Sequence, residues 1–314
     1  MNMSFWSHCQ GLVRRLQKRR LARPRARQRG WGLAETLEAR ALLSSTPAMV
    51  GDINPGPASS MSTTYWWPPA IAAIGSTIYF TADDGIHGAE LWKSDGTIGG
   101  TMMVKDIVPG AGEPNLANFT NVNGTLFFTA NDGIHGNELW KSDGTDAGTV
   151  MVRDINPGRP SPGHQSLDDP SGLTNVNGTL FFSADDGVHG SELWKSDGTA
   201  AGTTMVKDIA PGGFIGYYGG YYVRSSNPGS LINVNGTLFF GASSINGGPP
   251  DLWKSDGTAE GTIRLLWTVV GGEPTNVNGT LFFRAADSSS GAELWKSDGT
   301  VGGTTLVRLL GLEL

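Results

Sequence analysis

Acidic and histidine side chains that could perform acid–base chemistry or bind a metal occur together in one short stretch, present three times. The copies are ADDGIHG at 82–88, ANDGIHG at 130–136 and ADDGVHG at 184–190. A full calcium loop of the form D-x-[DN]-x-[DN]-G is absent from them. Each copy supplies one histidine, expected to lie too far from the others to share a metal. We therefore expect a turn at each copy, with no cofactor, and Ca2+ as the alternative.

A second motif, ELWKSDGT, combines acidic and aromatic side chains and is repeated more often. It begins at Glu90, Glu138, Glu192 and Glu293, and a fifth copy begins with Asp251. Catalysis needs one asymmetric set of groups in different roles, such as an acid and a base with separated pKa values. Five equivalent copies favour packing and turn formation instead. We expect no catalytic residue in the motif and no enzyme activity.

Each residue of ELWKSDGT has an expected structural role. Leu and Trp should point to opposite faces of a strand, and burying a Trp removes about 200 Å2 from water, worth several kcal/mol. The Asp should accept hydrogen bonds from its own turn, the Gly should adopt positive φ, and the Lys should stay in solvent. The residues assigned to this structural repeat are Trp92, Trp140, Trp194, Trp253, Trp295, Asp95, Asp143, Asp197, Asp256, Asp298, Gly96, Gly144, Gly198, Gly257 and Gly299.

Short strands must position these motifs. The Asp of SDGT recurs at spacings of 48, 54, 59 and 42 residues, which indicates a propeller, a solenoid or an array. In the second unit, ANFTNV, TLFFTA, ELWK and TVMVRDI have the composition of strands, and the NG between the first two predicts a hairpin turn. Four short antiparallel strands in about 50 residues are typical of a propeller blade.

The sequence therefore predicts an all-β protein, a β-propeller of about five four-stranded blades. A β-solenoid or repeat array is the alternative. The two predicted domains are a basic leader at 1–45, largely disordered or helical, and the repeat region at 46–314. The five units are expected near 71–110, 117–158, 172–212, 230–272 and 274–310.

Charge and composition limit the partners. The leader carries ten Lys or Arg against two acidic residues, whereas residues 46–314 carry 13 basic and 27 acidic residues. An acidic body argues against nucleic acid as a partner, because phosphate binding needs a basic surface. No apolar run is long enough to predict a transmembrane segment. Cys9 is the only cysteine, so no intramolecular disulfide is expected, and acidity favours a monomer.

The repeated phrases resemble a known family. NVNGTLFF begins at Asn121, Asn175, Asn233 and Asn276, and it is followed by ELWKSDGT, a further GT and V-K/R-D-I-x-P-G. Over about residues 48–310 these phrases resemble the ELWxxDGT-repeat family of bacterial exported and surface proteins. The stretch LEARALLSS at 37–45 resembles the LExRxLLS-type leader of exported proteins. The resemblance implies a propeller-like fold, an extracellular or cell-surface location and no established enzymatic activity.

Function is expected where the units differ, because loops on a rigid scaffold usually carry binding residues. The predicted ligand-binding residues lie in two aromatic loops: Tyr65, Trp66, Trp67, Tyr217, Tyr218, Tyr221, Tyr222 and Arg224. The predicted function is a non-catalytic exported binding or adhesion module for a glycan or a surface protein. One alternative is a glycan-active hydrolase using unrepeated carboxylates such as Asp168, Asp169, Asp251 or Glu273. The other is a purely structural surface repeat protein.

The strand that ends each unit has one more copy than the other strands of the unit. AMVGDINPG at 48–56 matches the end of a unit, although no unit precedes it, so this strand has six copies and the other strands have five. Either it joins the final blade and closes the ring, or the chain is an incomplete version of a larger propeller.

Overall fold

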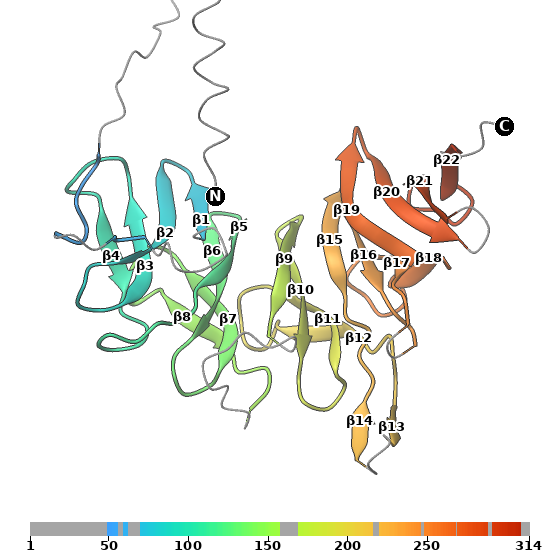
Figure 1. The fold of residues 1–314 in the computed structure, drawn as a ribbon, viewed down its shortest axis with the longest axis horizontal. Coiled ribbons are helices and arrows are strands. Elements are labelled where there is room, and N and C mark those ends of the chain that lie inside the picture. The colour runs from blue at the N-terminus through green and yellow to red at the C-terminus, as the bar shows by residue number, and fades with distance from the viewer. Residues whose placement is uncertain are drawn as a thin grey trace, which may run out of the picture. The chain divides into compact units, whose positions relative to one another are not determined.

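The computed structural model describes residues 49–55, 59–61, 70–157, 169–215, 220–245, 248–267, 269–287 and 291–308. Regular structure in these ranges consists of β-strands (Figure 1), which confirms the predicted all-β class. The predicted leader lies outside the described residues. Within the described part of the chain, no helix has the length and apolar character that crossing a membrane would require.

Five four-stranded antiparallel sheets follow one another along the described chain, each built from consecutive strands. A two-stranded sheet, β13 (Gly213–Ile215) and β14 (Tyr221–Val223), comes between the third and the fourth. The first sheet contains β1 (Ile71–Ile74), β2 (Thr77–Asp83), β3 (Ala89–Ser94) and β4 (Met102–Lys105). The second contains β5 (Ala117–Val122), β6 (Thr125–Asn131), β7 (Asn137–Ser142) and β8 (Val150–Arg153). The third contains β9 (Ser171–Val176), β10 (Thr179–Asp185), β11 (Ser191–Ser196) and β12 (Thr204–Lys207). The fourth contains β15 (Gly229–Val234), β16 (Thr237–Ala242), β17 (Asp251–Ser255) and β18 (Ile263–Leu266). The fifth contains β19 (Val269–Val277), β20 (Thr280–Asp287), β21 (Gly291–Ser297) and β22 (Thr305–Arg308).

The SDGT turn is held by its own side chains. In the second sheet Asp143 accepts hydrogen bonds from the Thr145 hydroxyl at 2.7 Å and from the Thr145 amide at 2.9 Å. These bonds hold the pKa of Asp143 below its ordinary value. Gly144 has φ of +88°, and the Ser142 hydroxyl is 2.7 Å from that of Thr149 across the turn. The same bonds recur in the other four copies.

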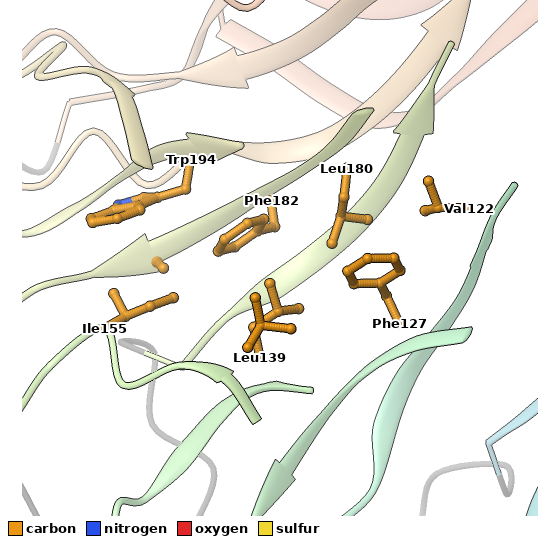
Figure 2. Packing of buried hydrophobic residues seen from close by; sticks show 9 residues of the cluster. Val122, Phe127, Leu139, Ile155, Leu180, Phe182 and Trp194 are labelled. Carbon is orange, nitrogen blue, oxygen red and sulfur yellow. The ribbon is translucent and has the colours of Figure 1, made fainter. Parts of the chain in front are cut away.

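Neighbouring sheets pack through one repeated apolar interface. Figure 2 shows it between the second and third sheets, where the two sets of side chains interdigitate. We call the face of a sheet that meets the next sheet along the chain its trailing face, and the opposite one its leading face. The trailing face of the second sheet supplies Val122, Phe127, Leu139, Val152 and Ile155, and the leading face of the third supplies Leu180, Phe182, Ala184 and Trp194.

Equivalent residues form the other three interfaces between consecutive sheets. Leu and Trp of the motif lie on opposite faces because successive side chains of a strand alternate. Trp140, Trp194 and Trp253 are buried on leading faces. Trp92 and Trp295, in the first and fifth sheets, are only half-buried.

Four of the five lysines of the motif do not remain in solvent, so that expectation was wrong for Lys93, Lys141, Lys195 and Lys254. Lys296 is exposed, as expected. Lys141 in the second sheet donates to the Gly198 carbonyl in the SDGT turn of the third sheet, at 2.8 Å. A Cβ on Gly198 would lie 3.0 Å from the Phe127 ring, so the turn fits closely against the preceding sheet. We call this hydrogen bond the lysine clasp. It recurs at Lys93 to Gly144, Lys195 to Gly257 and Lys254 to Gly299, at 2.6 to 2.8 Å.

The extra copy at the start of the repeats forms no strand over the described residues 49–55, and the fifth sheet contains only its own four strands, so the expectation that this copy joins the final blade was wrong. It lies at the first sheet instead. Asn54 is buried, and its side-chain oxygen lies 3.0 Å from the position of a Cβ on Gly85. Asn156, which closes the second unit, lies in the same way 2.7 Å from the position of a Cβ on Gly187 in the third. The N-terminal corner therefore occupies the place that a preceding unit would fill. The fifth sheet has a fourth strand of its own, β22.

Candidate functional site

The strongest cluster of ionisable groups lies where the acidic turn, the start of the ELWKSDGT strand and the D-I-x-P-G segment meet. In the second unit the ring Nδ1 of His135 lies 2.7 Å from Asp132 Oδ2. Asp132 Oδ1 accepts the backbone N–H of the same histidine at 2.8 Å. Glu138, the first residue of the motif, is buried and accepts the Ile155 N–H at 3.0 Å. We call this cluster the acid–histidine corner.

The first and third units repeat this corner closely. His87 Nδ1 lies 2.7 Å from Asp84, and His189 Nδ1 lies 2.8 Å from Asp186. Glu90 accepts the N–H of Ile107, and Glu192 accepts that of Ile209, both at 2.9 Å. Each Asp–His pair is contained within one turn. One aspartate accepts hydrogen bonds from both the ring and the backbone N–H of the histidine three residues later.

The Asp–His pairs are electrostatically matched. The hydrogen bond that the His135 ring donates to the Asp132 carboxylate raises the pKa of His135 above its ordinary value. Burial acts to raise the pKa of Asp132, but hydrogen bonds from the amide and ring of His135 outweigh it and lower that pKa. In the first and third units the pKa of the histidine is likewise raised and the pKa of the aspartate is likewise lowered. Each histidine therefore stays protonated to a higher pH than a free imidazole.

The buried glutamates are the residues that sequence reasoning missed. Burial raises the pKa of Glu138 to about 8, opposed by the Ile155 N–H and reinforced by the nearby Asp154 carboxylate. Burial likewise raises the pKa of Glu90 and of Glu192 to about 7. The available signal was a glutamate placed four times directly before the Leu-Trp pair of a strand otherwise fit for burial.

Within the described residues, the three corners pair an acid with a histidine. No hydroxyl or thiol is hydrogen-bonded to Nε2 of the three histidines among the residues that the structure describes. The described ranges also contain no group of three or more His, Cys, Asp or Glu side chains placed to hold a metal ion. The geometry supports two local roles. The buried glutamate binds a proton, and the Asp–His pair stabilises its own turn.

Most of the predicted ligand-binding residues cannot be placed. Tyr65, Trp66, Trp67, Tyr217 and Tyr218 lie outside the described residues.

The remaining three lie in or just after β14. Tyr221 and Tyr222 belong to that strand. Tyr222 is 52% exposed and stacks on Phe214 of β13, with ring centroids 5.6 Å apart. Arg224 follows the strand, and its carbonyl lies 2.2 Å from the position of a Cβ on Gly190, so the chain passes directly over the third corner.

The third corner anchors the segment that follows this hairpin. Ser226 donates its amide to Glu192 at 3.0 Å and its hydroxyl to the same carboxyl at 2.6 Å. The Ser226 amide also lies 3.0 Å from the Ser191 carbonyl. The aromatic hairpin is therefore tied to a buried proton-binding group.

The fourth unit replaces the corner with a different cluster. Asp251 stands where the other units have Glu and pairs with Arg264 at 3.1 Å. The Arg264 guanidinium lies 3.4 Å from the ring centroid of Trp267, which is 70% exposed. It also lies 5.7 Å from that of Trp253. Sequence reasoning did not find this cluster, because the unit loses the D-I-x-P-G phrase that marks the position.

The carboxylates of the alternative hydrolase do not come together. Asp168 lies outside the described residues. Asp169 accepts a hydrogen bond from Asn137 of the second sheet at 2.7 Å. Asp251 belongs to the fourth sheet and Glu273 to the fifth. No pair of these side chains forms an acid–base couple in the described structure.

No family model matches the chain, and no curated protein matches it. Solved structures do match, at low identity. A puromycin hydrolase mutant in complex with PGG is 13% identical, with a TM-score of 0.49 over 78% of this chain and 38% of that one. A Mycobacterium tuberculosis puromycin-hydrolyzing peptidase is 13% identical, with a TM-score of 0.44 over 78% and 37%. A prolyl endopeptidase structure is 12% identical, with a TM-score of 0.47 over 78% and 36%.

These matches correct the predicted function. The matched structures are named as a puromycin hydrolase, a puromycin-hydrolyzing peptidase and prolyl endopeptidases, so this comparison contradicts the prediction of a non-catalytic module binding a glycan or a surface protein. The prediction that the chain is no enzyme also has no support. The physical reason is that the repeated residues of ELWKSDGT pack sheets together. They therefore indicate a scaffold, and they give no information on whether other residues are catalytic. The chain spans less than two fifths of each match, and likeness at this level transfers no activity.

Proposed function

We propose that the five sheets are five blades of a rigid propeller-like scaffold, whose role is to hold the segments between and beyond the blades in place. The observation that carries this proposal is the recurrence of one interface. The same apolar side chains and the same lysine clasp join every consecutive pair of sheets. A second observation supports the proposal: each Asp–His pair is hydrogen-bonded within its own turn, which is a structural role.

The reaction class to test first is peptide hydrolysis, because two of the matched structures are named as a peptidase and as prolyl endopeptidases. The full chain is incubated with fluorogenic peptides, some with a residue before proline, beside a triple variant with His87, His135 and His189 each changed to Gln. As a scaffold, the chain gives the same turnover, or the same absence of turnover, in both forms. Turnover by the parent chain that is lost in the triple variant would place chemistry in the corners and contradict the scaffold role.

Family and location are proposals of the same kind. We infer from NVNGTLFF, ELWKSDGT and V-K/R-D-I-x-P-G that the chain belongs with the ELWxxDGT-repeat proteins and acts outside the cell or at its surface. Fractionation of a bacterium that expresses the full chain tests the location. Recovery of the chain in the medium or on the surface agrees with this proposal, and recovery only in the cytoplasm counts against it.

A further inference from the structure

The repeated interface leaves one unpaired face at each end of the array. Each of the four internal interfaces joins a trailing face of the Val-Phe-Leu-Val type to a leading face of the Leu-Phe-Ala-Trp type. In the first sheet Ile replaces the first Val and Tyr replaces Phe, and in the fourth Leu replaces the second Val. The first sheet has a leading face of the same kind, and the fifth has a trailing face of the same kind. Neither has an adjacent sheet along the described chain.

Both end faces expose side chains that are buried elsewhere. On the trailing face of the fifth sheet, Val277, Leu294 and Val307 are 47%, 39% and 43% exposed. Their counterparts in the second sheet are exposed by 6% or less. On the leading face of the first sheet, Ile78 is 40% exposed, whereas its counterpart Leu180 is fully buried. Phe80 and Ala82 of the same face are buried, so the open part of this face lies around Ile78 and the half-buried Trp92.

The polar part of the interface is also unpaired at both ends. Lys296 of the fifth sheet is exposed, and among the described residues it has no following SDGT turn to bind. Gly96 of the first sheet is exposed, whereas the four glycines that receive a lysine clasp are buried. A Cβ on Gly96 would have nothing within 4 Å, so no aromatic ring covers this turn. One end therefore has the donor of a clasp and the other has its acceptor.

The corner segment fits the same arrangement. Three of the internal trailing faces include an Ile from D-I-x-P-G, namely Ile107, Ile155 and Ile209. The fifth unit lacks this phrase. The first sheet already has the segment Asp52–Asn54 in the corner position, with Asn54 against Gly85. The leading end thus carries the one piece that the trailing end is missing.

We propose that a second copy of this chain docks head to tail, with the trailing face of its fifth sheet on the leading face of the first sheet. This goes beyond the scaffold role and replaces the expectation of a monomer. Lys296 of one copy would clasp Gly96 of the next, as Lys141 clasps Gly198 within the chain. The contact is heterologous, so it generates closed rings or open filaments according to the rotation between copies. Residues 46–314 carry 27 acidic against 13 basic residues, so salt should strengthen association by screening repulsion.

The test uses the full chain and two variants, each with one face blocked. Leu294→Glu blocks the trailing face, and Ile78→Glu blocks the leading face. Light scattering after gel filtration should show the parent mass rising with concentration above the 33.1 kDa of one chain. Each variant alone should stay at one chain, while their equimolar mixture should give twice that mass, because one intact face of each kind remains. Ile134→Glu, in an exposed turn away from these faces, is the control and should associate like the parent.

Two results would overturn the proposal. One is a parent chain that keeps the mass of one chain up to the highest soluble concentration in high salt, which would mean that the end faces close on each other or stay bare. The other is a mixture of the two folded variants that stays at one chain. Circular dichroism establishes that the variants fold. If Leu294→Glu does not fold, Lys296→Ala replaces it as the trailing-face variant, and this change should weaken association several-fold without touching the apolar core. If Ile78→Glu does not fold, the milder Ile78→Gln replaces it as the leading-face variant.

Discussion

At the scale of single residues, the glutamate that begins ELWKSDGT is a buried, proton-binding group, a role that the sequence analysis did not assign to the motif. Glu138 lies in the corner with Asp154 nearby, and it is more stable there with a proton than without one. A neutral carboxyl can still accept the Ile155 N–H and has a proton to donate. The glutamate therefore connects its strand to the D-I-x-P-G segment without adding a buried charge, whose desolvation would be costly.

This protonation predicts that stability falls as pH rises. The folded-state pKa values of Glu90, Glu138 and Glu192 are about 7, 8 and 7 against an ordinary 4.5. Their contribution is fully present below about pH 4.5 and is lost as pH rises through those folded values. The corner histidines, whose pKa values are also raised, act in the same direction. The melting temperature should be several degrees lower at about pH 8.5 than at about pH 5.5.

Glu138→Gln tests the cause of that change. The amide keeps the shape and an acceptor for Ile155 but has no proton to lose. The variant should show a smaller fall in melting temperature between the two pH values, because the glutamate with the highest of the three raised pKa values no longer titrates. An unchanged pH dependence would mean that Glu138 does not titrate in this range. Glu260→Gln, away from the corners, is the control.

Substitution of two glycines in the SDGT turns can distinguish the cost of backbone strain from the cost of poor packing. Gly96 and Gly198 have φ of +89° and +88°, but only Gly198 lies against an aromatic ring, that of Phe127. Both Gly→Ala changes should carry the strain of a left-handed conformation, about 1 kcal/mol. Gly198→Ala should lower the free energy of unfolding by a further 1 kcal/mol or so, because the added methyl crowds the interface. Equal losses in urea denaturation would show that the turn does not fit closely against its neighbour.

Strands were the part of the fold that the sequence predicted best, and the reason is local. ANFTNV was predicted as a strand and β5 has the same bounds, and TLFFTA differs from β6 by one residue. These segments have strand composition and an NG turn between them, so short-range chemistry decides them. The β13–β14 hairpin was not predicted, because its segment is rich in Gly and Tyr and shows no alternation of polar and apolar residues.

Contacts between elements were harder to predict than the elements themselves. The lysine clasp joins residues that lie 45 to 62 positions apart in the sequence. Its acceptor is a main-chain carbonyl, which leaves no trace in residue type. The acid–histidine corner was missed for a related reason. The Asp–His pair was visible in the sequence, but the burial of Glu138 depends on how the D-I-x-P-G segment folds back over it.

The lysine clasp should stabilise the interface between two particular elements. Lys141 Nζ is 2.8 Å from the Gly198 carbonyl and half-buried, whereas Lys296 is exposed at the end of the array. Lys141→Met should cost about 1 kcal/mol of unfolding free energy, since it removes a charged donor and leaves a carbonyl unpaired. Lys296→Met should cost much less in dilute solution, where copies stay separate. If the two variants lose the same stability, the clasp contributes nothing.

The array behaves as one series of equivalent contacts at the scale of the whole molecule. Each of the three middle sheets uses one face on its predecessor and the other on its successor, and four apolar interfaces join the five sheets. In repeat proteins of this kind, stability is a sum of unit and interface terms. Position in the series, rather than residue type, then decides what a given copy of the motif contributes. The same reasoning places the unpaired surface at the two ends.

The central claim is that copies of ELWKSDGT stabilise by joining neighbouring sheets, and one pair of variants tests it directly. Leu139 and Leu294 are the same residue of the same motif, but Leu139 is fully buried against the third sheet and Leu294 is 39% exposed. Urea unfolding of dilute full chain should show a loss of about 2 to 5 kcal/mol for Leu139→Ala and less than about 1 kcal/mol for Leu294→Ala. Similar losses at both positions would show that the motif stabilises its own sheet and would contradict the account.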